Sequence, residues 1–235
     1  MKRKFQMRNQ ITVFQYFITF LMSSFNTISF IYFLSQLEEI DRFLYMTWWN
    51  YYISSIFFIA ILICDTNLFI FKSKRFEYIN YYFRNHFYPI ILIYSIFVCI
   101  IYWCVINPLS GYKQMGEDFY TIFKNFNVHG LIVIFLFIDM IFAEREKYSY
   151  NNSDVSMLLA IITCYSILTI IMRKVFNIII YNFIELMSFS IMLFTCLCFY
   201  LLLLGFYFIY IIFINWMLKG KNININLEKA EKIKI

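Results

Sequence analysis

Long apolar segments alternate with short charged segments along the whole chain. Six of the apolar segments have about the length of 20 residues that a helix needs to cross a bilayer. Their boundaries, set by the flanking charges, are 11–34, 43–64, 87–106, 126–143, 155–172 and 186–210. The sequence therefore predicts an all-α fold, a multi-spanning transmembrane helix bundle. It forms one domain over 1–218, and a polar tail follows over 219–235.

The last apolar stretch leaves the number of spans open. Between Val175 and Trp216 the only charged residue is Glu185. This stretch is too long for one helix and has room for two, which would give seven spans. We favour a single span preceded by an apolar segment that lies at the membrane interface.

The distribution of Lys and Arg supports six spans. With six, 15 of these residues lie on the side of both chain ends and five on the other side. Cytosolic loops are enriched in Lys and Arg, so both termini are expected in the cytosol. A seventh span would carry the Lys-rich tail across the membrane. The pattern does not distinguish an endomembrane such as the endoplasmic reticulum from the plasma membrane.

Composition points to the same class of protein. The chain has 235 residues, of which 62% are hydrophobic and 14% charged, and its mean hydropathy is +0.69. Soluble domains carry about 25% charged residues, so this chain lacks the polar surface of a soluble globule. The formal charge of +6 lies in the loops that flank the spans and does not indicate nucleic-acid binding. The six cysteines lack metal-site spacing, so neither a metal nor another cofactor is predicted.

Polar side chains within the predicted spans are the first candidates for function, because burying them in a bilayer is costly. The scarce ones are Thr47, Asn50, His129, Asp139 and Glu185. Thr47 follows Arg42 by five residues, and His129 follows Lys124 by five residues. At 1.5 Å per residue, each lies roughly 7 Å beyond its last charged residue. Both helices enter from the non-cytosolic side, so Thr47 and His129 are expected at the same depth.

A hydroxyl and an imidazole at one depth have the minimum geometry for a nucleophile and its general base. Asn50 lies one turn after Thr47, where it could orient the base or donate to an oxyanion. Asp139 lies about 15 Å beyond His129, too far for a third member of a triad, and suits a hydrogen bond between helices or a neutral buried acid. Two simpler roles stay open: Thr47 could bond to its own i−4 carbonyl, and His129 could only link helices.

Short motifs around these residues resemble a known family. The first is the segment 42–47, RFLYMT, followed 18 residues later by Asp65. The second is Asn125 and His129, with Asp139 ten residues further on. Softer matches are Phe97 to Trp103, the segment 181–185, Gly205 and Trp216. Together they are similar to the androgen-induced and androgen-dependent TFPI-regulating proteins, and the similarity covers nearly the whole chain in order.

This resemblance implies a six-span hydrolase of fatty acid esters of hydroxy fatty acids, acting within membrane lipids on a lipid ester substrate. It implies that Thr47 is the nucleophile and His129 the base, with Asn50, Asn125, Asp139 and Glu185 as possible supporting residues. Two residues near His129 depart from the family pattern: Gly130 replaces the usual Thr, and Ile134 replaces a Pro. A third departure is Asn182, where a Pro is usual. The alternative is a non-enzymatic protein, a small transporter or lipid-binding partner protein, in which Asp139 and Glu185 line an ion path. Protein partners are not indicated.

Overall fold

The computed structural model describes residues 12–35, 45–106, 119–143, 148, 150–176 and 188–233, with residues 34, 74, 105–106, 119–122 and 220–233 as backbone only. The helices are α1 Val13–Ser35, α2 Met46–Phe71, α3 Lys74–Tyr82, α4 Tyr88–Ile101, α6 Phe119–Phe126, α7 Ile132–Phe142, α8 Asn152–Val175 and α10 Phe189–Ile233. Three π-helical turns continue them: η2 Phe83–Phe87, η3 Tyr102–Ile106 and η5 Asn127–Leu131. The described residues contain no strand, which confirms the all-α prediction.

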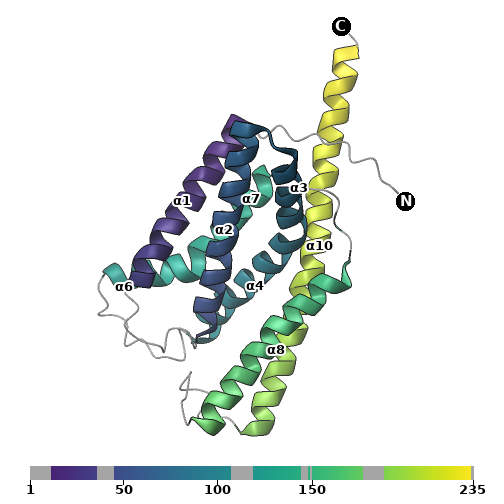
Figure 1. Ribbon diagram of the computed structural model, residues 1–235. Coiled ribbons are helices and arrows are strands. Elements are labelled where there is room, and N and C mark those ends of the chain that lie inside the picture. The colour runs from purple at the N-terminus through teal and green to yellow at the C-terminus, as the bar shows by residue number, and fades with distance from the viewer. Residues whose placement is uncertain are drawn as a thin grey trace.

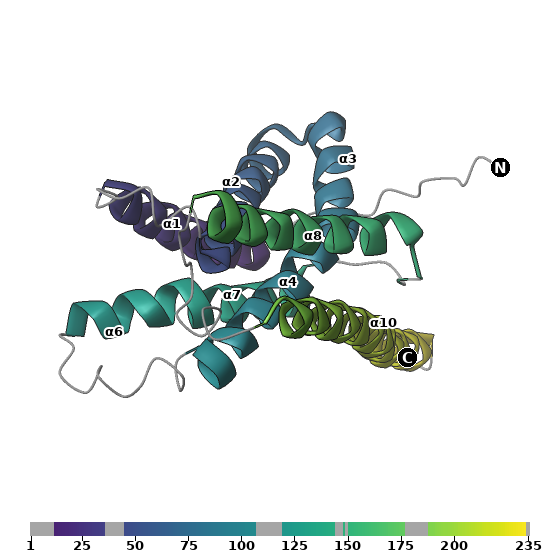
Figure 2. The ribbon, with the colours of Figure 1, turned by 90° about the horizontal axis from the view of Figure 1, so that it is seen from below.

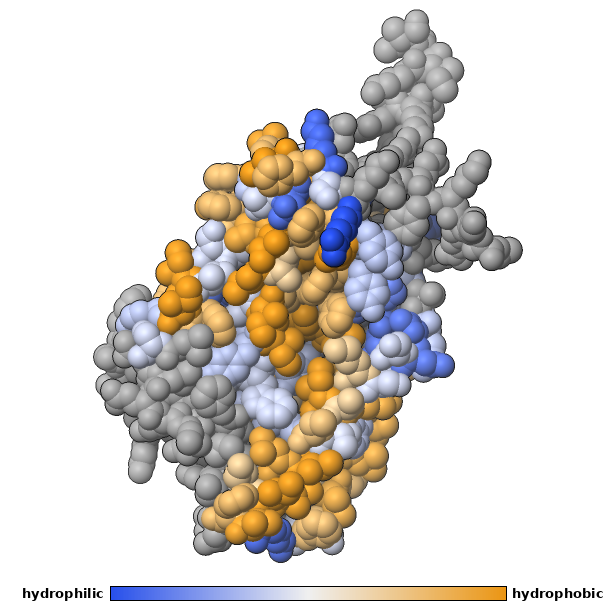
Figure 3. Space-filling model, viewed as in Figure 1, coloured by the Kyte–Doolittle hydropathy of each residue, from blue (hydrophilic) through white to orange (hydrophobic). Residues whose placement is uncertain are grey.

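Within the described residues, six helical segments are long and apolar enough to cross a membrane, as predicted. They are Val13–Phe33, Met46–Phe71, Arg75–Cys104, Phe123–Phe142, Asn152–Val175 and Phe189–Lys219. Helices suit the bilayer because they satisfy every backbone polar group within one segment. Large apolar side chains such as Ile28, Ile56 and Leu201 remain exposed on their outer faces. Apolar residues accordingly cover most of the described surface in Figure 3.

The six spans run alternately up and down (Figure 1). The beginning of α1 and the C-terminal end of α10 lie at the same end of the bundle, and α2 and α6 begin at the opposite end. α4 packs against α2, α7, α8 and α10. Figure 2, viewed from below, shows α4 between α7 and α10. α4 is therefore the central helix of the bundle.

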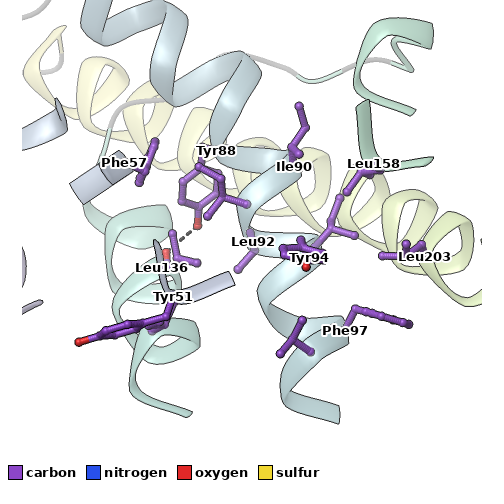
Figure 4. Packing of buried hydrophobic residues seen from close by; sticks show 14 of the residues in the cluster. Tyr51, Phe57, Tyr88, Ile90, Leu92, Tyr94, Phe97, Leu136, Leu158 and Leu203 are labelled. Carbon is purple, nitrogen blue, oxygen red and sulfur yellow. Dashed lines mark hydrogen bonds between the residues drawn. The ribbon is translucent and has the colours of Figure 1, made fainter. Parts of the chain in front are cut away.

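The core forms around α4. Its side chains Tyr88, Leu92, Tyr94 and Phe97 are almost fully buried, together with residues from five other helices. Figure 4 shows these contributors, which include Tyr51, Phe57, Leu136, Leu158 and Leu203. The Tyr88 hydroxyl donates to the Leu136 carbonyl oxygen at 2.5 Å, which joins α4 to α7. The polar tip of a buried tyrosine thus receives a partner, as buried hydroxyls require.

One predicted boundary is wrong. We expected a polar loop from Asp65 to His86 before a third span beginning at residue 87. Instead α2 continues to Phe71. Its C-cap is Lys72, which has a left-handed φ of 49°. α3 begins two residues later, and the third span begins at Arg75. The boundary is wrong because the prediction treats the charged residues between 65 and 86 as water-facing, whereas some of them pair inside the bundle, as described below.

The last apolar stretch contains one candidate span within the part of the chain that the structure describes, Phe189–Lys219. The predicted interfacial segment before it falls mostly on residues 177–187, outside the described residues, and so does Glu185. α10 continues as a helix to Ile233, through most of the polar tail. An even number of spans places both chain ends on one side.

The orientation of the bundle is a testable prediction. Glycosylation-acceptor tags at either terminus should stay unmodified, because the excess of Lys and Arg retains both ends in the cytosol. A tag inserted between residues 107 and 118, which follow the third span, should be glycosylated and serves as the positive control. Glycosylation of the C-terminal tag alone would require an odd number of spans.

Candidate functional site

Thr47 lies in the first turn of α2, which begins at Met46. Its side chain is 8% exposed, in the protein interior rather than towards lipid. A threonine within a helix usually bonds to the carbonyl four residues earlier, and Thr163, Thr169 and Thr195 do so at 2.7–2.9 Å. For Thr47 that residue is Phe43, which precedes α2. Phe43 lies outside the described residues, and so does the simpler role predicted for Thr47, a bond to that carbonyl.

The central helix α4 supports the first turns of α2. The Tyr94 hydroxyl lies 3.5 Å from the Met46 carbonyl oxygen as a donor. Ser95 donates to Oδ1 of Asn50 at 2.8 Å, and the Ser54 and Ser95 hydroxyls lie 3.4 Å apart. Because Oδ1 of Asn50 accepts, Nδ2 is the donor end of this buried amide, one helical turn after Thr47.

His129 lies in the π-helical turn η5, between α6 and α7, and is 5% exposed. Its imidazole stacks on the Tyr102 ring, with centroids 3.3 Å apart and planes 10° apart. Tyr102 itself lies in η3, the π-helical end of the third span. Nδ1 of His129 has no hydrogen-bond partner among the described residues. π-Helical turns within α-helices are rare and are frequent at functional sites.

Several contacts join the first turn of α2 to the neighbourhood of His129. α2 packs directly against η5. The Lys124 ammonium lies 5.8 Å from the centroid of the Trp48 ring, which joins α6 to the residue after Thr47. Nδ2 of Asn127 donates to the Ser29 hydroxyl at 3.2 Å, which joins η5 to α1. The elements that carry Thr47 and His129 thus meet at the same end of the bundle.

Of the other predicted supporting residues, Asp139 does not lie there, and Glu185 is outside the described residues. Asp139 is buried in α7 and accepts from Nη2 of Arg84 at 3.0 Å. The same nitrogen lies 2.9 Å from Asp65, which also accepts from Asn80 at 2.6 Å. This cluster, Asp65–Asn80–Arg84–Asp139, joins α2, α3, η2 and α7 near the opposite end. Asp139 is therefore an interhelical ion-pair partner in the structure.

Sequence reasoning missed Ser95, Tyr102 and Arg84. Ser95 is the only hydroxyl-bearing residue besides two tyrosines in α4, but a lone serine gives no sign of its partner. Tyr102 is one of 20 tyrosines, so composition hides it. Asn125 is half-buried on α6, and the nearby hydrogen bond to α1 comes from Asn127 instead. Contacts between helices decide each of these roles, and no local pattern encodes them.

Six bilayer-length helices with polar groups gathered inside define a multi-pass integral membrane protein. The family model of the FAR-17a/AIG1-like protein matches residues 11–219, which include all six spans. The chain therefore belongs to this family, which confirms the resemblance inferred from the motifs around Thr47 and His129. No curated protein and no solved structure matches the chain.

Proposed function

We propose that this protein is an intramembrane hydrolase in which Thr47 is the nucleophile and His129 the general base. The substrate is a fatty acid ester of a hydroxy fatty acid or a related lipid ester. The observation that carries the proposal is the packing of α2, which carries Thr47 in its first turn, against the π-helical turn with His129. Membership of the FAR-17a/AIG1-like family over all six spans supports it.

The reaction divides into two acyl transfers. Oγ of Thr47 attacks the ester carbonyl carbon while His129 takes the hydroxyl proton. The tetrahedral intermediate expels the alkoxide of the hydroxy fatty acid, which receives that proton from His129. Water, deprotonated by His129, then attacks the Thr47 acyl ester. Collapse releases the fatty acid and returns the proton to Oγ of Thr47.

Two kinds of donor can stabilise the oxyanion of the intermediate. The N–H groups of Trp48 and Trp49 bond to the Tyr45 carbonyl oxygen, so the first-turn N–H groups that precede these bonds are those of Met46 and Thr47, at the positive end of the helix dipole. Nδ2 of Asn50 is a second donor, whose orientation is fixed by the 2.8 Å bond from Ser95 to Oδ1. Donors held before the reaction are effective because no reorganisation is needed as the charge develops.

The location of the site suits a lipid ester and water together. The two acyl arms of such an ester can lie along the apolar faces of the helices. Thr47 and His129 lie on spans near the end where both enter the membrane, so water has a short path to the acyl-enzyme. The transporter alternative relied on Asp139 as a lining residue of an ion path, but Asp139 is buried in an ion pair with Arg84.

A fluorophosphonate probe tests the proposal directly, since it reacts with activated hydroxyls. We expect labelling of the wild-type protein in membranes, competition by a branched fatty acid ester, and loss of labelling in Thr47→Ala. Thr163→Ala is the matched control, because the Thr163 hydroxyl bonds to the Leu159 carbonyl on another span, α8. Equal labelling of the Thr47→Ala and wild-type proteins would remove Thr47 as the nucleophile.

A further inference from the structure

Within the part of the chain that the structure describes, the proposed base lacks the usual third member of a hydrolase triad. In a Ser-His-Asp triad, a carboxylate holds the imidazole in place and stabilises the imidazolium that forms. Here Nδ1 of His129 has no hydrogen-bond partner within the described chain. The acid on the same span, Asp139, is ten residues away and pairs with Arg84. Another group must therefore orient the imidazole.

Tyr102 has the geometry for this task. Its ring lies parallel to the imidazole at a centroid separation of 3.3 Å, which restricts rotation of the His129 ring out of this plane. The ring edge, which carries both nitrogens, stays outside the stacked face. Trp103 packs against Tyr102 edge to face, with centroids 5.1 Å apart, and limits its movement. Two π-helical turns, η3 and η5, bring the two rings together.

We infer that Tyr102 is the positioning residue for His129 and replaces the triad carboxylate. This inference rests on the proposed function. The ring face holds the imidazole plane and, when His129 has taken the Thr47 proton, attracts the imidazolium through a cation–π interaction. A neutral ring suits a site within the membrane, because an additional carboxylate would have to be buried as a second charge.

Replacing Tyr102 separates positioning from substrate binding. In Tyr102→Leu, kcat for ester hydrolysis should fall roughly tenfold while KM stays the same, because the ring acts on the protonated base and not on the substrate. Tyr102→Phe keeps the ring face and should restore most of kcat. Tyr200→Leu, which removes a tyrosine between α8 and α10, should leave kcat unchanged and serves as the control. A wild-type kcat in Tyr102→Leu would overturn the inference.

A second measurement does not depend on activity or on the folding of Tyr102→Leu. His86→Gln leaves His129 as the only histidine, so its imidazole protons can be observed by NMR in detergent micelles. Stacking on Tyr102 should shift them upfield of free histidine, and Tyr102→Phe should keep this shift. Protons at the free-histidine position would overturn the stacked arrangement. If the shift is present and kcat depends on Tyr102, both proposals stand. If no ester is cleaved, the proposed function fails, and the positioning role fails with it even where the upfield shift persists.

Discussion

Thr47→Ala and His129→Ala should each lower ester hydrolysis by about a thousandfold or more. Each substitution removes one half of the nucleophile and base pair, and neither half acts without the other. The double variant should therefore be little worse than either single variant, since the second change removes nothing that still functions. Purified protein and a branched fatty acid ester, with the released acid quantified by mass spectrometry, give the required rates.

Thr47→Ser is the most informative variant in this series. It keeps the hydroxyl and removes the methyl group that crowds the β-carbon, so a substantial part of the activity should remain. The two matched controls are Thr169→Ala and His86→Ala. The Thr169 hydroxyl bonds to the Tyr165 carbonyl, and His86 is the second histidine of the chain. Both controls should retain turnover. If Thr47→Ala cleaved the ester as fast as the wild type, Thr47 would be only a buried helix-terminal residue.

The apolar pattern predicted the helix bounds well wherever the charged residues are exposed to water. The expected span 155–172 corresponds to α8, Asn152–Val175, and the charges that flank it lie at its ends. The prediction failed at Asp65 and Arg84, which are 1% and 8% exposed and lie within helices. Hydropathy treats each charge as an isolated group in contact with water. It cannot anticipate that a carboxylate and a guanidinium 19 residues apart pair in the interior.

The sequence predicted only part of the candidate site. Depth from the membrane surface is a local property, since each residue adds a fixed rise along its helix, and it selected Thr47 and His129. The partners that hold them are not local. Ser95 reaches Asn50 from 45 residues away, and Tyr102 reaches His129 from another span. Helix–helix packing determines such pairs. Composition alone does not distinguish Tyr102 from the many other tyrosines that could lie beside His129.

Arg84→Leu should be the most destabilising single substitution in the cluster Asp65–Asn80–Arg84–Asp139. The guanidinium lies 2.9 Å from Asp65 and 3.0 Å from Asp139, and both carboxylates are almost fully buried. Removing Arg84 leaves both acids inside the bundle without the guanidinium that lies between them. Breaking a buried ion pair in this way costs about 3–5 kcal/mol of folding free energy. Thermal unfolding in detergent, followed by helical circular dichroism, measures the loss.

Two further variants show whether the loss of stability in Arg84→Leu comes from the buried ion pair or from the loss of any arginine. Arg75→Leu removes an exposed arginine from α3 and should change stability by no more than about 0.5 kcal/mol. Asp139→Asn leaves the Arg84–Asp65 pair intact, so it should destabilise less than Arg84→Leu and retain hydrolysis. If Asp139→Asn remained folded but lost turnover as completely as His129→Ala, the ion pair would be coupled to catalysis. Asp139 would then belong to the reaction and not to the scaffold, because a purely structural acid cannot stop the chemistry in a protein that is still folded.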